Sequence, residues 1–258
     1  MLTYKQKEEI TKIINDSLDN AEKHWKNGGH LLQESITMDS IGRVGMDSEV
    51  SKIPGHTKVQ DKETVIDEFI ALVMDMRDSS KHLMQEIGSP AKVSRLERVY
   101  YETSALLPAV EQTIKYSEGS VTEYLGDGIL AFFKVNEDDN QETIREVYRV
   151  SRNIMGDTLS IIINNILKER YALPALEIGI GLSISKALIT LVGLSGEKHP
   201  KAFGSCVFYA TKLSGGQNEI FTDKWLRDSW PSSHGGRLKF QAKKIKSVNG
   251  YLIARGEQ

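Results

Sequence analysis

The chain has 258 residues, of which 40% are apolar and 26% charged, and its formal net charge is −2. This composition is typical of a globular protein that buries a full core, so it excludes a disordered chain and argues against a general nucleic-acid binder. The single cysteine, Cys206, excludes an intramolecular disulfide. The first residues lack the apolar core of a signal peptide, and no apolar run reaches the ~20 residues that cross a bilayer, so we expect a cytoplasmic protein without a membrane partner.

Residues 1–60 are predicted to form a helix followed by an irregular arm. Apolar residues recur at helical spacing over residues 4–26, which indicates an amphipathic helix ending near Gly28. Residues 28–62 show no sustained period and contain glycine and proline breakers, so they fit an arm that lies over the domain or over a partner subunit. We therefore divide the chain into residues 1–60 and a folded catalytic domain over residues 61–258.

A buried strand that ends in an aspartate is predicted next. Residues 69–74 are six consecutive apolar residues with β-branched members, the pattern of a strand buried on both faces. Asp75 follows where this strand ends. Ser79 and Ser80 then favour the start of a helix that runs over residues 81–87.

A second aspartate is predicted at the tip of a hairpin. After a helix over residues 93–118, two short strand-like runs flank Gly126-Asp127-Gly128, the residue types of a tight turn. An aspartate at a strand end and one at a hairpin tip can meet on neighbouring strands. Two carboxylates that converge disfavour joint ionisation unless a cation lies between them, so the pair predicts a magnesium site of the kind that handles nucleotide phosphates. Taken separately, Asp75 also fits a helix cap and Asp127 a plain turn residue.

The rest of the chain is predicted as helices that alternate with short strands. These are a helix over residues 142–171, an apolar hairpin from residues 175–184 and 186–192, a polar loop over 193–200, a helix over 203–213, a strand over 219–222, a helical turn around Trp225, and a final hairpin from strands 237–242 and 251–254 around Asn249-Gly250. The order β-α-α-β-β-α-β-β-α-β with a final hairpin predicts an α+β protein. Its core is a ferredoxin-like βαββαβ unit, in which helices cover a mixed sheet.

Four stretches in this order resemble the motifs of one protein family. They are the strand, aspartate and helix start over residues 73–80, the hairpin aspartate over residues 124–133, the Ile-Gly-Leu-Ser-Ile-Ser-Lys-Ala run over residues 180–187, and Ala202-Phe203-Gly204 followed by Ala210-Thr211-Lys212-Leu213. With them, the chain from about residue 69 to its end resembles the class III adenylate/guanylate cyclase family. The resemblance implies a lyase that converts a nucleoside triphosphate to the 3′,5′-cyclic monophosphate and pyrophosphate, using two Mg²⁺ or Mn²⁺ ions per active site. It also implies a homodimer whose active sites lie between the subunits.

The resemblance assigns roles to individual residues. It implies that Asp75, Asp127 and the backbone carbonyl of Met76 bind metal, and that the backbone N–H groups of the turn hold the phosphates (Arg77, Asp78, Ser79 and Ser80). Three further positions are implied in the second half of the site. Phe208 stands where the family has an asparagine that orients the ribose, Lys212 stands where it has a transition-state arginine, and Lys243, with Lys244 beside it, matches a phosphate-binding lysine.

The positions that read the base match neither purine pattern. Glu123 stands where adenylate-forming members have a lysine and guanylate-forming members a glutamate, and Lys201 stands at the second base-reading position. Glu123 can accept from a base amino group and Lys201 can donate to a base carbonyl, but the two can equally form an exposed ion pair. The Asp-Met-Arg-Asp-Ser-Ser run over residues 75–80 and the short N-terminal arm resemble the bacterial anti-phage pyrimidine cyclases of the Pycsar type. That resemblance implies CTP or UTP as substrate, and cyclic CMP or cyclic UMP as a second messenger bound by a separate effector protein.

Several alternatives stay open. The chain fits a purine cyclase, or a catalytically silent cyclase-like module that binds a nucleotide or a partner, which Phe208 and Lys212 favour. A diguanylate-forming relative is disfavoured because the Gly-Gly-(Asp/Glu)-Glu-Phe hairpin is absent. Nucleic-acid binding by the C-terminal lysines is disfavoured because no aromatic platform accompanies them.

Overall fold

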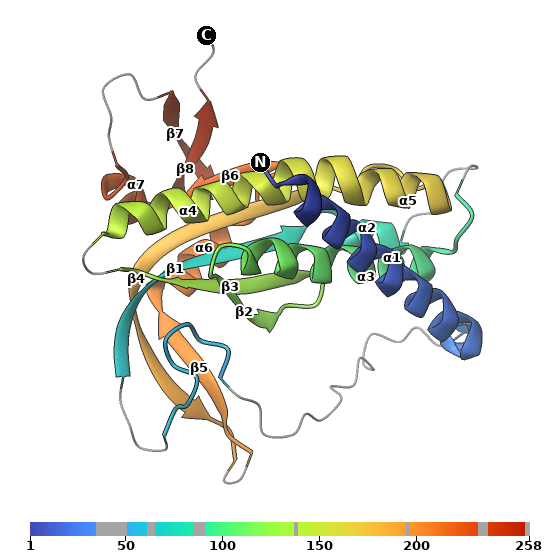
Figure 1. Ribbon diagram of the computed structural model, residues 1–258, viewed down its shortest axis with the longest axis horizontal. Coiled ribbons are helices and arrows are strands. Elements are labelled where there is room, and N and C mark those ends of the chain that lie inside the picture. Colours follow the sequence, from blue (N-terminus) through green and yellow to red (C-terminus); the bar gives the residue numbers. More distant parts are fainter. Residues whose placement is uncertain are drawn as a thin grey trace.

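The sheet that organises the chain is mixed and has eight strands (Figure 1). The computed structural model describes residues 1–34, 51–60, 65–84, 91–136, 139–194, 197–231 and 237–255. The strands are β1 Val65–Met76, β2 Ser120–Tyr124, β3 Gly128–Lys134, β4 Ile178–Val192, β5 His199–Gly204, β6 Glu219–Thr222, β7 Leu238–Ile245 and β8 Val248–Arg255. Their order is β2-β3-β1-β4-β6-β8-β7, with β5 paired to β4; β4 and β6 run parallel, whereas the other pairs are antiparallel. The predicted α+β fold with a mixed sheet is confirmed.

Helices cover both faces of this sheet. The helical elements are α1 Tyr4–Asn27, η1 Gly29–Glu34, α2 Ser79–Met84, α3 Arg95–Lys115, α4 Asn140–Asn153, the π-helix η2 Ile154–Ile163, α5 Asn164–Tyr171, α6 Ser205–Leu213 and α7 Lys224–Asp228. The central strand β1 shows how the two faces are used. Ile70, Leu72 and Met74 pack with α1, α3 and η2, whereas the alternate residues Ala71 and Val73 pack with α6. By the same alternation, Asp75 at the end of β1 lies on the α6 face.

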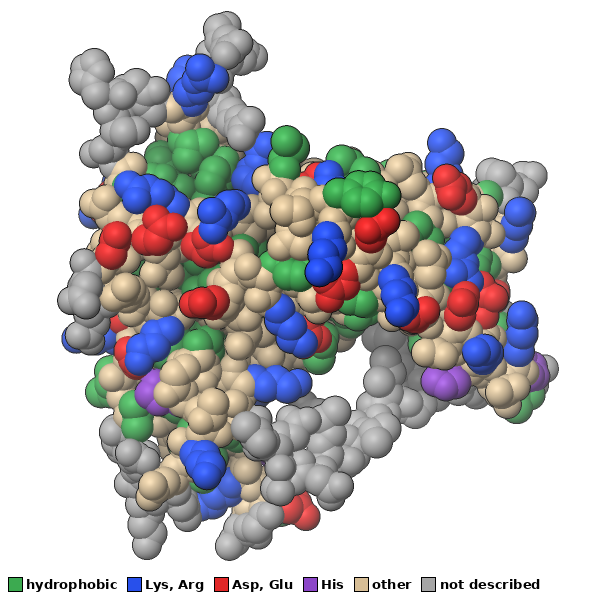
Figure 2. Space-filling model, in the orientation of Figure 1, with side chains coloured by type: hydrophobic (Ala, Val, Ile, Leu, Met, Phe, Trp, Pro, Cys, Tyr) green, Lys and Arg blue, Asp and Glu red, His purple; other side chains and the backbone are tan. Residues whose placement is uncertain are grey.

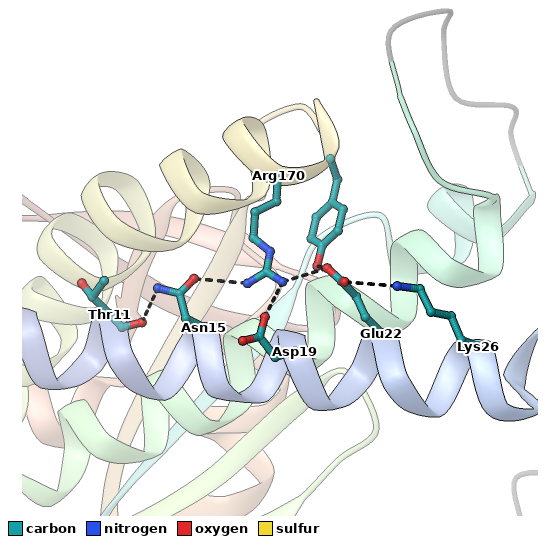
Figure 3. A network of polar contacts seen from close by, with 7 residues as sticks. Thr11, Asn15, Asp19, Glu22, Lys26 and Arg170 are labelled. Carbon is teal, nitrogen blue, oxygen red and sulfur yellow. Dashed lines mark hydrogen bonds and ion pairs between the residues drawn. The ribbon is translucent and has the colours of Figure 1, made fainter.

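The N-terminal helix α1 packs into the larger hydrophobic core, which also contains Ile70, Leu72 and Met74 of β1. Its buried stripe is Ile10, Ile14, Leu18, Ala21 and Trp25, and a capping box at Thr3 begins the helix. Figure 3 shows how α5 holds it: Arg170 donates to Asp19 Oδ1 at 2.6 Å and to Glu22 Oε1 at 2.8 Å. The Tyr171 hydroxyl also donates to Glu22 Oε1, at 2.7 Å. The proposed division at residue 60 stays a prediction, because residues 35–50 and 61–64 lie outside the described residues.

Most predicted elements are confirmed with bounds that differ by up to four residues, the largest shift being the start of β1, and two hairpins are corrected. The hairpin expected over residues 175–192 is wrong, because β4 is one strand of 15 residues that runs straight through Ser185 and Lys186. Its hairpin partner is β5, which occupies the end of the expected polar loop and the start of the expected helix. The helix over residues 142–171 is confirmed as the continuous run of α4, η2 and α5, and Pro108 lies inside an unbroken α3.

The final hairpin turns earlier than expected. Ile245 pairs with Val248, so the turn is Lys246-Ser247, and Asn249-Gly250 lies inside β8. Glycine is needed at position 250 because of close packing and not because of a turn: a Cβ on Gly250 would lie 2.3 Å from Leu213 Cδ2. The predicted end of the helix near residue 87 lies outside the described residues.

The surface carries charges of both signs. Figure 2 shows basic and acidic side chains interspersed over the visible face, in keeping with the net charge of −2. Among the helices that the structure describes, none has the length and apolar character needed to span a membrane.

Candidate active site

The structure brings the two predicted aspartates to the same end of the sheet. In the β1–β3 ladder, Asp75 lies opposite Gly128, directly beside Asp127. The Met76 N–H donates to the carbonyl of Asp127, with N and O 3.4 Å apart, so the tip of the β2–β3 hairpin is fastened to the end of β1. The turn itself depends on Gly126, whose φ of +83° favours glycine.

Charged groups of both signs act on the Asp75 carboxyl. Burial raises the pKa of the Asp75 carboxyl, and the negative charge of Asp127 raises it further. The guanidinium of Arg77 opposes both effects by forming an ion pair with Asp75, and the charge of Lys246 lowers the pKa of Asp75 as well. In the metal-free chain, positive side chains therefore compensate the two carboxylates.

The donor set fits a magnesium or manganese ion. Within the described ranges, no group of three or more histidine, cysteine, aspartate or glutamate side chains gathers that could hold a metal. Two carboxylates are nevertheless enough for Mg²⁺, which keeps several waters and is usually bound by one or two carboxylates together with substrate phosphates. Asp75 and Asp127 fit that role, and the carbonyl of Met76, the residue between Asp75 and the turn, is a candidate third donor.

The predicted phosphate-contacting residues lie in one turn after Asp75. The Arg77 N–H donates to the carbonyl of Glu177 at 2.8 Å, which ties the turn to the start of β4. Asp78 adopts a φ of +58°, and its carboxylate pairs with Lys81 at 2.6 Å. Ser79 and Ser80 then begin α2, as predicted. Their contact with phosphate stays a prediction.

The two predicted base-reading residues contact each other. Glu123 on β2 and Lys201 on β5 form an ion pair with 2.7 Å between Oε2 and Nζ. Both side chains are partly exposed, at 31% and 38%. The structure thus brings together two residues far apart in sequence, although their role in reading a base stays a prediction.

Phe208 and the partly buried Lys212 lie on the solvent-facing side of α6. The Phe208 side chain is 53% exposed, and the Lys212 Nζ lies 5.8 Å from the centroid of its ring. The ring of Phe208 also packs edge-on against Tyr209, which in turn contacts Trp225. These aromatic residues therefore form a continuous, partly exposed surface beside the lysine.

The C-terminal lysines divide into two environments. Lys243 on β7 pairs with Glu219 on β6, with Nζ and Oε1 2.9 Å apart. Lys246, in the β7–β8 turn, is the lysine whose charge reaches Asp75, and sequence analysis missed it. The position of the turn could have identified Lys246. When the turn of the final hairpin is placed at Lys246-Ser247 instead of Asn249-Gly250, Lys246 lies at the same end of the sheet as Asp75.

Comparison with known proteins identifies the fold. No protein-family model and no curated protein matches this sequence. Among solved structures, the guanylyl cyclase Cya2 matches with a TM-score of 0.60 and 16% identity, over 75% of this chain and 95% of that one. The adenylyl cyclase CyaB from P. aeruginosa matches with a TM-score of 0.59 and 13% identity, over 76% of this chain and 98% of that one. A class III adenylyl cyclase-like ATP-binding protein from Pseudomonas aeruginosa matches with a TM-score of 0.57 and 13% identity, over 81% of this chain and 43% of that one. This chain has the fold of the class III nucleotidyl cyclase catalytic domain.

Proposed function

We propose that this protein is a nucleotidyl cyclase. The observation that carries the proposal is the register of the β1–β3 ladder, in which Asp75 lies beside Asp127, directly after a run of six buried residues in β1. The similarity to a guanylyl cyclase and an adenylyl cyclase supports the same reaction class. In this reaction the ribose 3′-hydroxyl loses its proton to solvent or to the leaving pyrophosphate as O3′ forms a bond to the α-phosphorus. The bond from that phosphorus to the oxygen that bridges it to the β-phosphorus breaks, and pyrophosphate leaves.

The residues of this chain supply binding and orientation. Asp75, Asp127 and the carbonyl of Met76 would hold Mg²⁺ or Mn²⁺, which when bound lowers the pKa of the 3′-hydroxyl and neutralises charge on the leaving pyrophosphate. The backbone N–H groups of residues 78–80 would bind the β- and γ-phosphates, whereas the N–H of Arg77, predicted to join them, donates to the carbonyl of Glu177 instead. Lys212 and Lys243 supply positive charge to the phosphates, and Phe208 offers a ring on which a sugar or base can stack.

The complete site is proposed to need two copies of the chain. Phe208 and the partly buried Lys212 lie on the solvent-facing side of α6, where a second subunit can reach them. In a homodimer with twofold symmetry, these residues would face the aspartates of the other subunit, and two equivalent sites would result.

The proposed substrate is CTP or UTP. The Glu123–Lys201 pair offers one acceptor and one donor, which suits the amino or imino group and the carbonyl of a pyrimidine. The Asp-Met-Arg-Asp-Ser-Ser run supports the same branch by its resemblance to the anti-phage pyrimidine cyclases. The product would then act as a second messenger on a separate effector protein.

A purine cyclase and a silent nucleotide-binding module are the alternatives. The silent module is favoured by Phe208, which cannot form the hydrogen bond expected at its position. The structural similarity to a cyclase-like ATP-binding protein points the same way.

Turnover measurements separate these functions. The purified protein is incubated with ATP, GTP, CTP or UTP and with Mn²⁺ or Mg²⁺, and the products are separated by mass. A cyclic monophosphate from CTP or UTP alone supports the proposal, whereas a product from a purine overturns the pyrimidine assignment and keeps the reaction. The variants Asp75→Asn and Asp127→Asn should abolish turnover while the protein stays folded, and Asp16→Asn, an exposed carboxylate on α1, should retain it. No product from any of the four favours the silent module.

A further inference from the structure

A buried carboxylate lies behind the turn that follows Asp75. Glu102 on α3 has 0% exposure, and each of its oxygens contacts one donor. The Arg98 Nε–H donates to Oε1 at 2.8 Å, and His82 Nδ1 lies 2.8 Å from Oε2. A carboxylate is costly to bury unless it is paired and hydrogen-bonded, so the loss of either donor leaves a buried oxygen without its partner.

The contact between His82 and Glu102 attaches α2 to α3. α2, as far as the structure describes it, has no fully buried residue that would hold it by packing. Its other described bond to α3 is exposed: Arg95 Nη1 donates to the carbonyl of Met84 at 3.0 Å. His82, whose side chain is only 16% exposed, therefore supplies the buried attachment of this helix.

The position of α2 sets the position of the turn. The turn joins Asp75 directly to α2, and the His82 N–H donates to the carbonyl of Asp78 at 2.8 Å. At its other end, the turn is held by the bond between Arg77 and Glu177 described above. Without the His82–Glu102 contact, the α2 end of the turn would depend on the exposed bond between Arg95 and Met84.

We propose that His82 is a positioning residue for the triphosphate, acting through Glu102 to hold the turn over residues 77–80 in place. This inference rests on the proposed function, because it assumes that the turn contacts phosphates. Removing a partner that orients a metal ligand from behind typically costs about 10- to 100-fold in affinity or activity, and we take this as the scale for a partner of a phosphate-binding turn. The expected effect is therefore on the affinity for the triphosphate.

The chain contains a matched control for this contact. His56 Nε2 lies 3.0 Å from Asp67 Oδ2, with both side chains 15% exposed, near the start of β1. It is also a histidine–carboxylate contact, at the opposite end of the strand from Asp75, but Asp67 is less buried than Glu102 and has a second partner in Lys134, at 2.6 Å. His56→Ala therefore removes a contact of the same kind away from the site, and should lower the stability of the fold by less than His82→Ala without affecting the site.

The test measures binding of inorganic tripolyphosphate with Mn²⁺ by calorimetry, and the thermal unfolding of each variant. His82→Ala should raise the Kd for tripolyphosphate about tenfold or more, whereas His56→Ala leaves it unchanged. His82→Asn, whose amide places a donor near the position of Nδ1, should restore most of the affinity. If His82→Ala does not fold, His82→Gln, which moves the donor farther from the backbone, should show a weaker loss in the same direction.

Equal affinity in His82→Ala and His56→Ala would overturn the inference, and so would a failure of the parent protein to bind tripolyphosphate. The readout uses no base and no turnover, so it is independent of the substrate assignment. Tripolyphosphate binding that depends on His82 in a protein without turnover would overturn the cyclase proposal and keep the inference. If His82→Ala and His56→Ala have equal turnover and equal affinity for tripolyphosphate, the cyclase proposal stands and the positioning role of His82 is rejected.

Discussion

Replacing Asp127 by asparagine should change the stability of the protein in opposite directions with and without a divalent metal. Without metal, Asp127 repels the partly buried Asp75 and raises its pKa. The substitution removes this repulsion and keeps a side chain of the same shape in the turn. With metal, the same substitution removes a ligand, so the variant should lose the stabilisation that binding provides.

The magnitude follows from the register of the ladder. Directly opposed residues in an antiparallel pair have Cα atoms about 5 Å apart, which puts the neighbouring carboxylates at roughly 6 Å. Two unit charges at that distance repel by about 0.7 kcal/mol in water and by about 3 kcal/mol at an effective dielectric constant of 20. Asp75 is 31% exposed, so a value between these limits applies, about 1–2 kcal/mol. For a protein of this size that corresponds to a rise in Tm of about 2–6 °C. The parent protein should instead gain about 2.7 kcal/mol when Mn²⁺ is present at 100 times its Kd.

Thermal unfolding in EDTA and in MnCl₂ tests this reasoning. The parent protein should melt below Asp127→Asn in EDTA and above it in saturating Mn²⁺. Asp16→Asn, which removes one exposed negative charge from α1, should follow the parent in both conditions. The idea that the two carboxylates form one cation site would be refuted if Asp127→Asn had a lower Tm than the parent in EDTA. It would also be refuted if Mn²⁺ raised the Tm of Asp127→Asn as much as that of the parent.

Four further outcomes are expected. Arg77→Ala should strengthen Mn²⁺ binding about fivefold, measured by electron paramagnetic resonance, because the guanidinium competes with the metal for Asp75. Gly181→Ala should destabilise the fold by about 1–3 kcal/mol in urea denaturation, because its Cβ would lie 2.1 Å from the carbonyl oxygen of Ala210 and would push α6 off the sheet. Arg170→Ala should cost about 1–2 kcal/mol by the same assay, because α5 loses its bonds to two carboxylates of α1. In metal-free buffer, the contribution of Asp75 to stability should be present below its unfolded pKa, near 3.8, and should be lost as the pH rises through its raised folded pKa. Stabilisation by Mn²⁺ should grow over the same interval, because the metal and the proton compete for one carboxylate.

The elements that carry the two aspartates were predictable because their signals are local. The apolar run over residues 69–74 identifies a strand buried on both faces, and β1 indeed packs against helices on both. The Gly126-Asp127-Gly128 turn needs a positive φ at its first residue, which glycine supplies. Even the meeting of the two aspartates follows from a strand end and a hairpin tip in one sheet.

The errors arose where distant packing outweighs a local pattern. Ser185 and Lys186 have the residue types of a turn, yet β4 continues through them because it pairs on one side with β1 over twelve residues. Gly250 has the residue type of a turn, yet it is required by its contact with Leu213 on α6. Neither partner is visible in the sequence near these residues. The error at the final hairpin also hid Lys246, whose place beside Asp75 depends on which two residues form the turn.

The way in which the fold places its side chains explains how the site can vary while the fold stays the same. Asp75 is placed by two ladders: β1 pairs with β3 from Phe69 to Asp75 and with β4 from Val65 to Met76. Its position therefore depends on backbone bonds and buried apolar residues, and very little on the polar residues that contact it. Phe208, in contrast, is 53% exposed on α6, with Lys212 beside it, and a change of an exposed side chain costs the fold little. A fold that matches a guanylyl cyclase with a TM-score of 0.60 at 16% identity is what this arrangement should produce. The proposed metal-binding pair, Asp75 and Asp127, is placed by the central strand, whereas the proposed sugar and phosphate contacts on α6 can change with little effect on that strand.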